Sequence, residues 1–79
     1  MSDTFTKVKD ILVEKFNIEQ NQIQEDTSLD YDLGIGTFDL LEFIGVVQKE
    51  FNIGIPNKMV EDFVTVEDVV NYVDAHRNR

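Results

Sequence analysis

The residues best suited to chemistry lie where an acidic loop turns into an apolar helix, at Gly34, Gly36 and Thr37. Glycine permits backbone conformations that a side chain forbids, so the two glycines predict a sharp turn. A threonine hydroxyl at such a turn can accept a hydrogen bond from an early helix amide, which makes Thr37 a candidate N-cap. The same hydroxyl could act as a nucleophile, but the sequence offers no credible base to activate it. We therefore do not expect an enzyme.

Metal sites built on cysteine or histidine are not expected either. Cysteine is absent, and His76 is the only histidine, so no set of soft or imidazole ligands can form. If Asp30 is taken as the first position of a calcium loop, Ile35 falls where glycine is needed and Leu41 where a bidentate carboxylate is needed. We expect no dedicated calcium site, although an acidic loop could bind divalent ions loosely.

The charge of the chain is strongly acidic, with 16 Asp and Glu against 7 Lys and Arg and a net charge of −9. No basic residue lies between Lys15 and Lys49. Nucleic acid and anionic membrane surfaces would meet like charge, so both are disfavoured as partners. A basic patch on a partner protein is favoured. The alternative is a solvated acidic loop that only keeps the protein soluble. The acids of this interval are Glu19, Glu25, Asp26, Asp30, Asp32, Asp39 and Glu42.

A chain of 79 residues predicts a single domain, residues 1–79. No apolar run is long enough to span a membrane, and no basic segment followed by an apolar one marks a signal peptide. The lack of cysteine fits a reducing compartment. These features predict a cytoplasmic protein.

Apolar residues recur at spacings of three and four in three stretches, which predicts three helices and a small all-α bundle. The first helix should end near residues 16–18, where Asn17 tolerates the left-handed conformation. The second should run from about Thr37 to Phe51, and the last should start at Thr65, which opens a Ser/Thr-x-x-acid signal. A short helical segment fits residues 57–63. The predicted core face of the second helix is Leu40, Leu41, Ile44, Val47 and Phe51, with Phe43 at its margin.

Two features between these helices stand out. Residues 19–36 form a long polar loop, which Ile23, Leu29 and Leu33 should pin to the core, with a short helical turn around residues 21–25. Gly45 lies in the middle of the second helix at a cost of about 1 kcal/mol relative to alanine. Close approach of another helix explains that glycine, and room for a ligand is the alternative.

Several short stretches form one ordered pattern along the chain: Glu25-Asp26-Thr27-Ser28-Leu29, Asp32-Leu33-Gly34, Asp39, Glu42, Glu50-Phe51, Ile55-Pro56 and Thr65-Val66-Glu67-Asp68-Val69-Val70. In their order and spacing, from Val8 to about Ala75, the sequence resembles the acyl carrier protein family. The similarity implies a right-handed four-helix bundle with a long loop between the first two helices and a short third helix. It also implies a carrier, a monomer, on which a 4′-phosphopantetheine arm holds an acyl group as a thioester for fatty-acid, polyketide or related biosynthesis.

The resemblance places the arm on Thr37 and assigns partner binding to acids on and before the second helix. The partners it implies are basic patches of synthase or acyl-transfer enzymes and a phosphopantetheinyl transferase. The acids so assigned are Asp32, Asp39, Glu42 and Glu50.

The sequence departs from the family at the attachment motif itself, where Gly36-Thr37-Phe38 replaces Asp-Ser-Leu. Thr37 keeps a hydroxyl, but its extra methyl crowds and stiffens the side chain. Gln48 and Lys49 also stand where acids are usual. Two hypotheses follow: a specialised carrier modified at Thr37, or an unmodified adaptor that binds partners through its acidic face.

Overall fold

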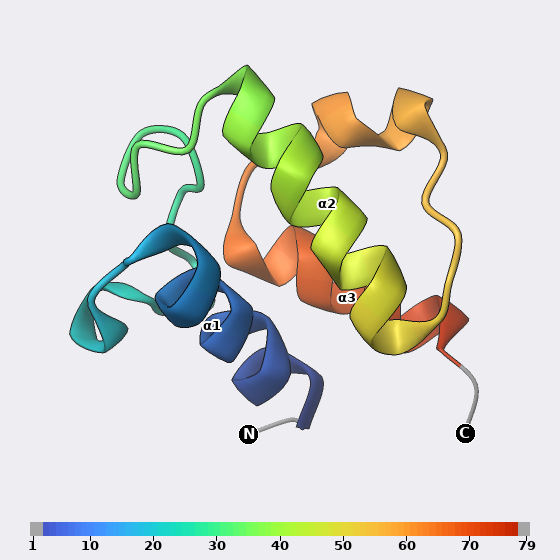
Figure 1. Cartoon of the computed structure of the whole chain (residues 1–79), viewed down its shortest axis with the longest axis horizontal. Helices are drawn as coiled ribbons and strands as arrows, with labels where there is room; N and C mark the ends of the chain where they lie inside the picture. The colour runs from blue at the N-terminus through green and yellow to red at the C-terminus, as the bar shows by residue number, and fades with distance from the viewer. Residues whose placement is uncertain (1–2, 78–79) are drawn as a thin grey trace.

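The structure is a computed structural model that describes residues 3–77, and its regular elements within that range are all helical (Figure 1). The predicted all-α bundle is confirmed, and the third of its four helices is a short 3₁₀ helix. A further 3₁₀ turn in the long loop covers residues 20–22, slightly before the predicted turn at residues 21–25. The elements are α1 (Asp3–Phe16), η1 (Gln20–Gln22), α2 (Thr37–Phe51), η2 (Asn57–Asp62) and α3 (Val66–His76).

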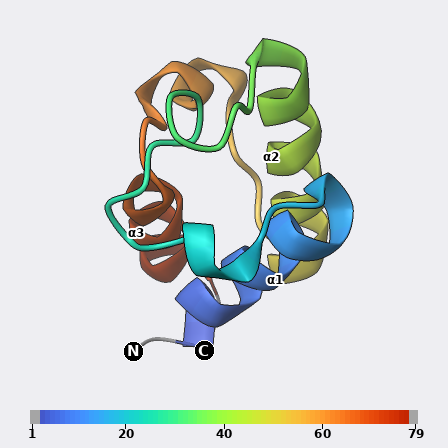
Figure 2. The ribbon, with the colours of Figure 1, turned by 90° about the vertical axis from the view of Figure 1, so that its left-hand side faces the viewer.

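The core lies between the three long helices, because α1 packs against both α2 and α3, and η2 closes against α2 (Figures 1 and 2). Each long helix contributes one apolar stripe, and the four valines of α3 are 5% exposed or less. Valine favours strands, but here helical spacing and burial outweigh that preference. The buried residues of the long helices include Phe5, Val8, Ile11 and Leu12 of α1, Ile44, Val47 and Phe51 of α2, and Val66, Val69, Val70 and Val73 of α3.

The predicted core face of α2 is wrong at two positions. Phe43, expected at the margin, is 0% exposed, whereas Leu41 is 47% exposed. Successive residues of an α-helix are rotated by about 100°, so residues 41 and 43 face nearly opposite directions. Phe43 takes the inward position and meets the ring of Phe16 edge-on, with 6.0 Å between the ring centroids.

Gly45 lies on the exposed side of α2, and a Cβ atom built there would meet nothing within 4 Å. The expectation that another helix approaches closely at this glycine is therefore wrong. One other local prediction holds, for Asn17, and Asn52 behaves in the same way. Asn17 follows the last residue of α1 with a φ of 59°, and Asn52 follows α2 with a φ of 56°, so both adopt the left-handed conformation after a helix.

Candidate functional site

Thr37 is the first residue of α2, and it is not the N-cap. Gly36 is the N-cap, with an extended backbone (φ −79°, ψ −171°), and its carbonyl oxygen accepts a hydrogen bond from the amide of Leu40 at 2.8 Å. An N-cap residue has a non-helical backbone, and Thr37 is already helical. Its exposed hydroxyl makes no hydrogen bond with any residue that the structure describes. The oxygen therefore remains available for other chemistry.

The turn before Thr37 is held by its own backbone. Gly34 has a φ of +70°, where a side chain would be strained, and its amide donates to the carbonyl of Asp30 at 2.9 Å. The amide of Ile35 donates to the carbonyl of Leu29, also at 2.9 Å. Leu29 and Ile35 are both buried. Sequence analysis found the anchor at Leu29 but missed Ile35, which fixes the chain two residues before Thr37.

The long loop is also tied to the segment that precedes α3. The amide of Leu29 donates to the carbonyl of Val64 at 2.8 Å, and the amide of Val66 donates to the carbonyl of Thr27 at 3.0 Å. These bonds flank an isolated antiparallel bridge between Ser28 and Thr65. Figure 2 shows the loop running across this end of the bundle. Thr37 is therefore positioned by contacts that reach from the loop to the last helix.

The predicted start of α3 is confirmed as a capping box. Oγ1 of Thr65 accepts from the amide of Asp68 at 3.3 Å, and Oδ2 of Asp68 accepts from the amides of Thr65 and Val64 at 3.0 and 2.9 Å. The amide of Thr65, and then that of Val64, lowers the pKa of Asp68 against the opposing effect of burial, because both bonds favour the ionised carboxylate. The box holds the segment to which the loop is tied.

A hollow of about 320 Å³ opens beside Thr37, between the start of α2 and the segment from η2 to α3. Its walls are mainly apolar, while Ser28, Asp30 and Glu61 supply polar atoms at its edge. Sequence analysis left open whether such a space exists, since it depends on how distant segments pack. The apolar lining includes Leu29, Ile35, Leu40, Val60, Phe63 and Val64.

The four predicted partner-binding acids are all exposed, but they do not form one patch around Thr37. Asp39 and Glu42 are three residues apart and so share a face of α2. Asp39 lies only two residues after Thr37 and therefore points to roughly the opposite side of the helix. Glu50 lies in the last turn, and Oδ2 of Asp32 accepts a loop hydrogen bond from the amide of Ser28 at 2.8 Å.

Gln48, which stands where an acid was expected, has a structural task. Its side-chain oxygen accepts a hydrogen bond from the amide of Ile55 at 2.8 Å, which fastens the connection between α2 and η2. Lys49 is exposed. The end of α2 is therefore less acidic than its beginning.

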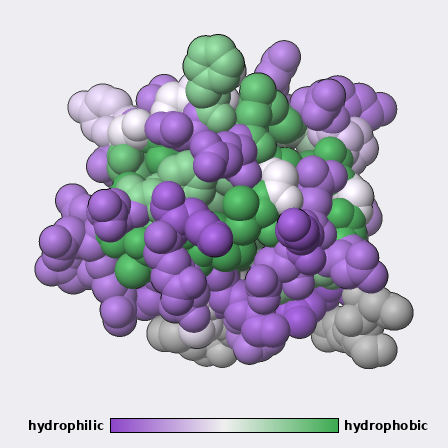
Figure 3. All heavy atoms as spheres, viewed as in Figure 1, coloured by the Kyte–Doolittle hydropathy of each residue, from purple (hydrophilic) through white to green (hydrophobic). Residues whose placement is uncertain are grey.

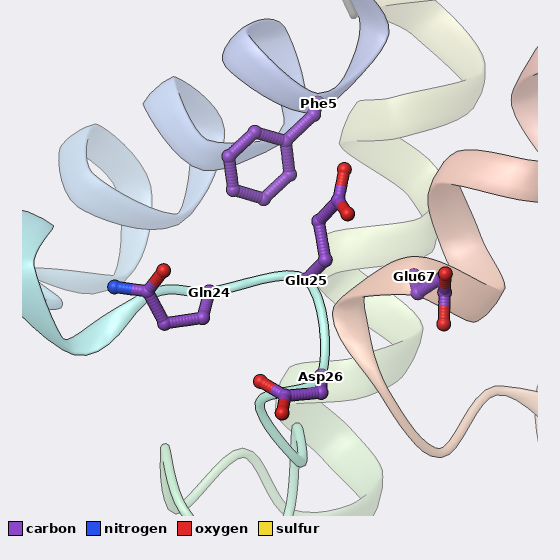
Figure 4. A pocket seen from close by; sticks show the side chains of 5 residues that line it. All are labelled: Phe5, Gln24, Glu25, Asp26 and Glu67. Carbon is purple, nitrogen blue, oxygen red and sulfur yellow. The ribbon is translucent and has the colours of Figure 1, made fainter. Parts of the chain in front are cut away.

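A second, wider hollow of about 640 Å³ lies between α1, the long loop and the start of α3, and shares no lining residue with the first. Figure 4 shows that its carboxylates, from Glu25, Asp26 and Glu67, point in different directions, and that only the side chain of Glu25 extends toward Phe5. Within residues 3–77, no group of three His, Cys, Asp or Glu side chains is placed to hold a metal ion. His76 instead stacks on Tyr72, with 4.0 Å between ring centroids.

Among the described residues, no helix is both long and apolar enough to cross a membrane.

Comparison with known proteins gives a consistent result. The family model described as "Phosphopantetheine attachment site" matches residues 6–73. The acyl carrier protein of Zymomonas mobilis is 38% identical over 77 residues, covering 98% of this chain and 99% of that protein. The acyl carrier protein of Clostridium acetobutylicum is 39% identical over 72 residues, covering 91% and 94% of the two chains. That of Wolinella succinogenes is 32% identical over 73 residues, covering 92% and 96%.

The site fits the group that the family model describes. A phosphopantetheine arm needs a hydroxyl that solvent and a transferase can reach, and the hydroxyl of Thr37 is exposed and makes no hydrogen bond to the described residues. No Cβ-sized group at Gly36 would meet a neighbour within 4 Å, so the approach from that side is open. The chain therefore belongs to the acyl carrier protein family, whose prosthetic group is 4′-phosphopantetheine and whose members are carriers and not enzymes.

Proposed function

We propose that this protein carries acyl groups as thioesters on a 4′-phosphopantetheine arm attached to Oγ1 of Thr37. The observation that supports this most is the hydroxyl itself, which is exposed at the start of α2 and caps nothing. A threonine kept only for capping would make a hydrogen bond to a helix amide. The arm would supply the thiol that holds the acyl group, and the apolar hollow beside Thr37 offers a place where part of that group could be shielded from water.

Attachment requires Oγ1 of Thr37 to act as a nucleophile toward coenzyme A. A bond forms between Oγ1 and the phosphorus that carries the pantetheine, the bond from that phosphorus to the nucleotide breaks, and the hydroxyl proton passes to a base of the transferase. The methyl group of Thr37 restricts rotation about χ1 and crowds the oxygen. We therefore expect modification to be slower than for a serine at the same position, since small misplacements of a reacting atom are costly.

The partners we propose are a phosphopantetheinyl transferase and synthase or acyl-transfer enzymes of fatty-acid, polyketide or related biosynthesis. The net charge of −9 favours basic patches on these enzymes and disfavours nucleic acid and anionic membranes. The exposed acids Asp32, Asp39, Glu42 and Glu50 are the proposed contacts. We propose a monomer in the cytoplasm.

An unmodified adaptor is the second candidate, and the attachment motif favours it. Gly36-Thr37-Phe38 differs from the family pattern at three adjacent positions. Such a module would bind partners through its acids without carrying an arm.

Intact mass spectrometry separates the two candidates. The purified protein is incubated with coenzyme A and a broad-specificity phosphopantetheinyl transferase, beside Thr37→Ser and Thr37→Val. The carrier proposal predicts a gain of one phosphopantetheine group for the native chain and Thr37→Ser, and none for Thr37→Val, which keeps the shape but lacks the hydroxyl. An unmodified native chain beside a modified Thr37→Ser chain would establish the adaptor instead.

A further inference from the structure

Side-chain bulk at the attachment turn is distributed differently from the family pattern of Asp-Ser. Gly36 has no side chain, and Thr37 has one methyl group more than serine. The fold explains neither change. The backbone of Gly36 (φ −79°, ψ −171°) suits any residue, and a Cβ atom there would meet nothing within 4 Å. The hydroxyl of Thr37 makes no hydrogen bond with the residues that the structure describes. The reason for the pair therefore lies in what binds at this turn.

The chain just before Thr37 leaves the hydroxyl uncovered. Gly34 and Gly36 have no side chains, and Ile35 between them is only 3% exposed, so its side chain is buried in the core. On the other side, Phe38 is 88% exposed and is rotated by about 100° from Thr37 around the axis of α2. Figure 3 shows the start of α2 at the top of the molecule, where side chains project into solvent. A ligand can therefore approach Thr37 from the side of the preceding turn.

The side chain of Thr37 leans toward this uncovered stretch. The Cα–Cβ bonds of an α-helix tilt toward its N-terminus, so the first residue of α2 leans back toward position 36. Threonine in a helix divides between two χ1 rotamers, and a rotation that presents Oγ1 to an enzyme also moves the methyl group. A side chain at position 36 would compete for that space. An N-cap side chain in particular turns toward the second and third amides of the helix, and so covers the same end of it.

We propose that Gly36 determines whether a threonine can serve as the attachment residue. Its missing side chain supplies the room that the methyl group of Thr37 needs when a transferase brings coenzyme A to Oγ1. The inference rests on the proposed function of Thr37. Gly36 is a positioning residue, because it acts through the orientation of Thr37 and touches no reacting atom. Both residues line the same hollow, which extends the free space beside the hydroxyl. A serine lacks the methyl group and does not need this room.

The test is a double-mutant cycle on kcat/KM for modification by a broad-specificity phosphopantetheinyl transferase with coenzyme A. Its four proteins are the native chain, Gly36→Asp, Thr37→Ser and the double variant. In the native background, Gly36→Asp should lower kcat/KM by about tenfold or more, mainly through kcat, because a displaced oxygen reacts slowly. In the Thr37→Ser background, the same change should alter kcat/KM by less than about threefold, and this difference measures the coupling of the two residues.

Three controls separate bulk beside Thr37 from other effects. Aspartate is a preferred N-cap residue, so Gly36→Asp should fold normally, which circular dichroism checks. Gly36→Asn has nearly the same shape without the charge and should act as Gly36→Asp does. Gly45→Ala adds a Cβ atom at another exposed glycine of α2, away from the turn, and should leave kcat/KM within about twofold.

The outcomes distinguish this inference from the proposed function. If Gly36→Asp lowers kcat/KM by the same factor in both backgrounds, or by less than about twofold in the native one, the inference is overturned and the carrier function stands. A loss with Gly36→Asp that Gly36→Asn does not share also overturns it, because charge and not bulk is then responsible. A native chain that stays unmodified while Thr37→Ser is modified overturns the proposed function, and this inference with it.

Discussion

Replacing Asp68 with alanine tests whether the capping box at the start of α3 stabilises the turn that leads to Thr37. Oδ2 of Asp68 accepts hydrogen bonds from the amides of Val64 and Thr65. The carbonyl of Val64 in turn accepts from the amide of Leu29 in the loop that leads to Thr37. Loss of the carboxylate leaves two amides without their protein acceptor, so both the start of α3 and the attachment turn should loosen.

The expected size follows from those two bonds. A protein hydrogen bond contributes about 0.5–1.5 kcal/mol net, and the partly exposed position of Asp68 lets water replace some of this. Asp68→Ala should therefore lower the free energy of unfolding by about 1–2 kcal/mol. A domain of this length is stable by only about 4–12 kcal/mol, so the loss is substantial. With a urea m-value of about 1 kcal/mol per M, the midpoint should fall by about 1–2 M.

Urea denaturation followed by circular dichroism measures this change, with Glu67→Ala as the matched control. Glu67 is an exposed acid in the same first turn that lies outside the capping box. The pKa of Asp68 is lowered in the folded state, so its contribution is present above its ordinary pKa of about 3.9 and is lost as the pH falls through the folded value. The difference between native and Asp68→Ala proteins should therefore shrink below about pH 4. Hydrogen exchange at the Leu29 amide should also be faster in the variant.

The capping account is refuted if Asp68→Ala shifts the midpoint no more than Glu67→Ala does. It is also refuted if the difference between Asp68→Ala and native protein stays unchanged down to about pH 2.5.

Three further predictions concern α2. Phe43→Leu should lower the free energy of unfolding by about 1–2 kcal/mol because Phe43 is fully buried. Leu41→Ala should lower it by less than about 1 kcal/mol because Leu41 is half exposed. Equal losses in urea denaturation would contradict the observed orientation of the helix. Thr37→Val should change the free energy of unfolding by less than about 0.5 kcal/mol in urea denaturation, since the hydroxyl caps nothing. A loss as large as that of a broken N-cap would show that the hydroxyl caps the helix after all. Gly45→Ala should raise the free energy of unfolding by about 0.5–1 kcal/mol, and with it the melting temperature, because a Cβ atom there meets only open space. A lower melting temperature would indicate a contact that the structure does not show.

Features set by neighbouring residues could be predicted from the sequence. Asn17 and the Thr65–Asp68 box depend on local backbone conformation and on hydrogen bonds within a few residues, and both were predicted. The helical stripes of α1 and α3 were also predicted, because their apolar residues leave one choice of inner face. On α2, Leu41 and Phe43 are both apolar, so only packing against α1 and η2 decides which one is buried.

The candidate site shows the same division. The position of Thr37 at the start of a helix was predicted, but the predicted N-cap was wrong by one residue. Glycine and threonine can both be N-caps, and only the backbone angles of Gly36 show which of the two residues is the cap. The hollow beside Thr37 could not be predicted, because its walls come from α2, the loop and the segment from η2 to α3, which are distant in sequence. The exposure of Phe38 also depends on the direction in which α2 faces.

Fragment mass spectrometry of the modified peptide tests the central claim most directly. Trypsin cuts after Lys15 and Lys49 and nowhere between them, so one peptide, residues 16–49, holds Thr37 together with the hydroxyls of Thr27, Ser28 and Tyr31. After treatment with transferase and coenzyme A, we predict that the added mass appears in every fragment that contains Thr37 and in no fragment that ends before it. An unmodified peptide, or added mass on Ser28, would contradict the assignment of Thr37 as the attachment site.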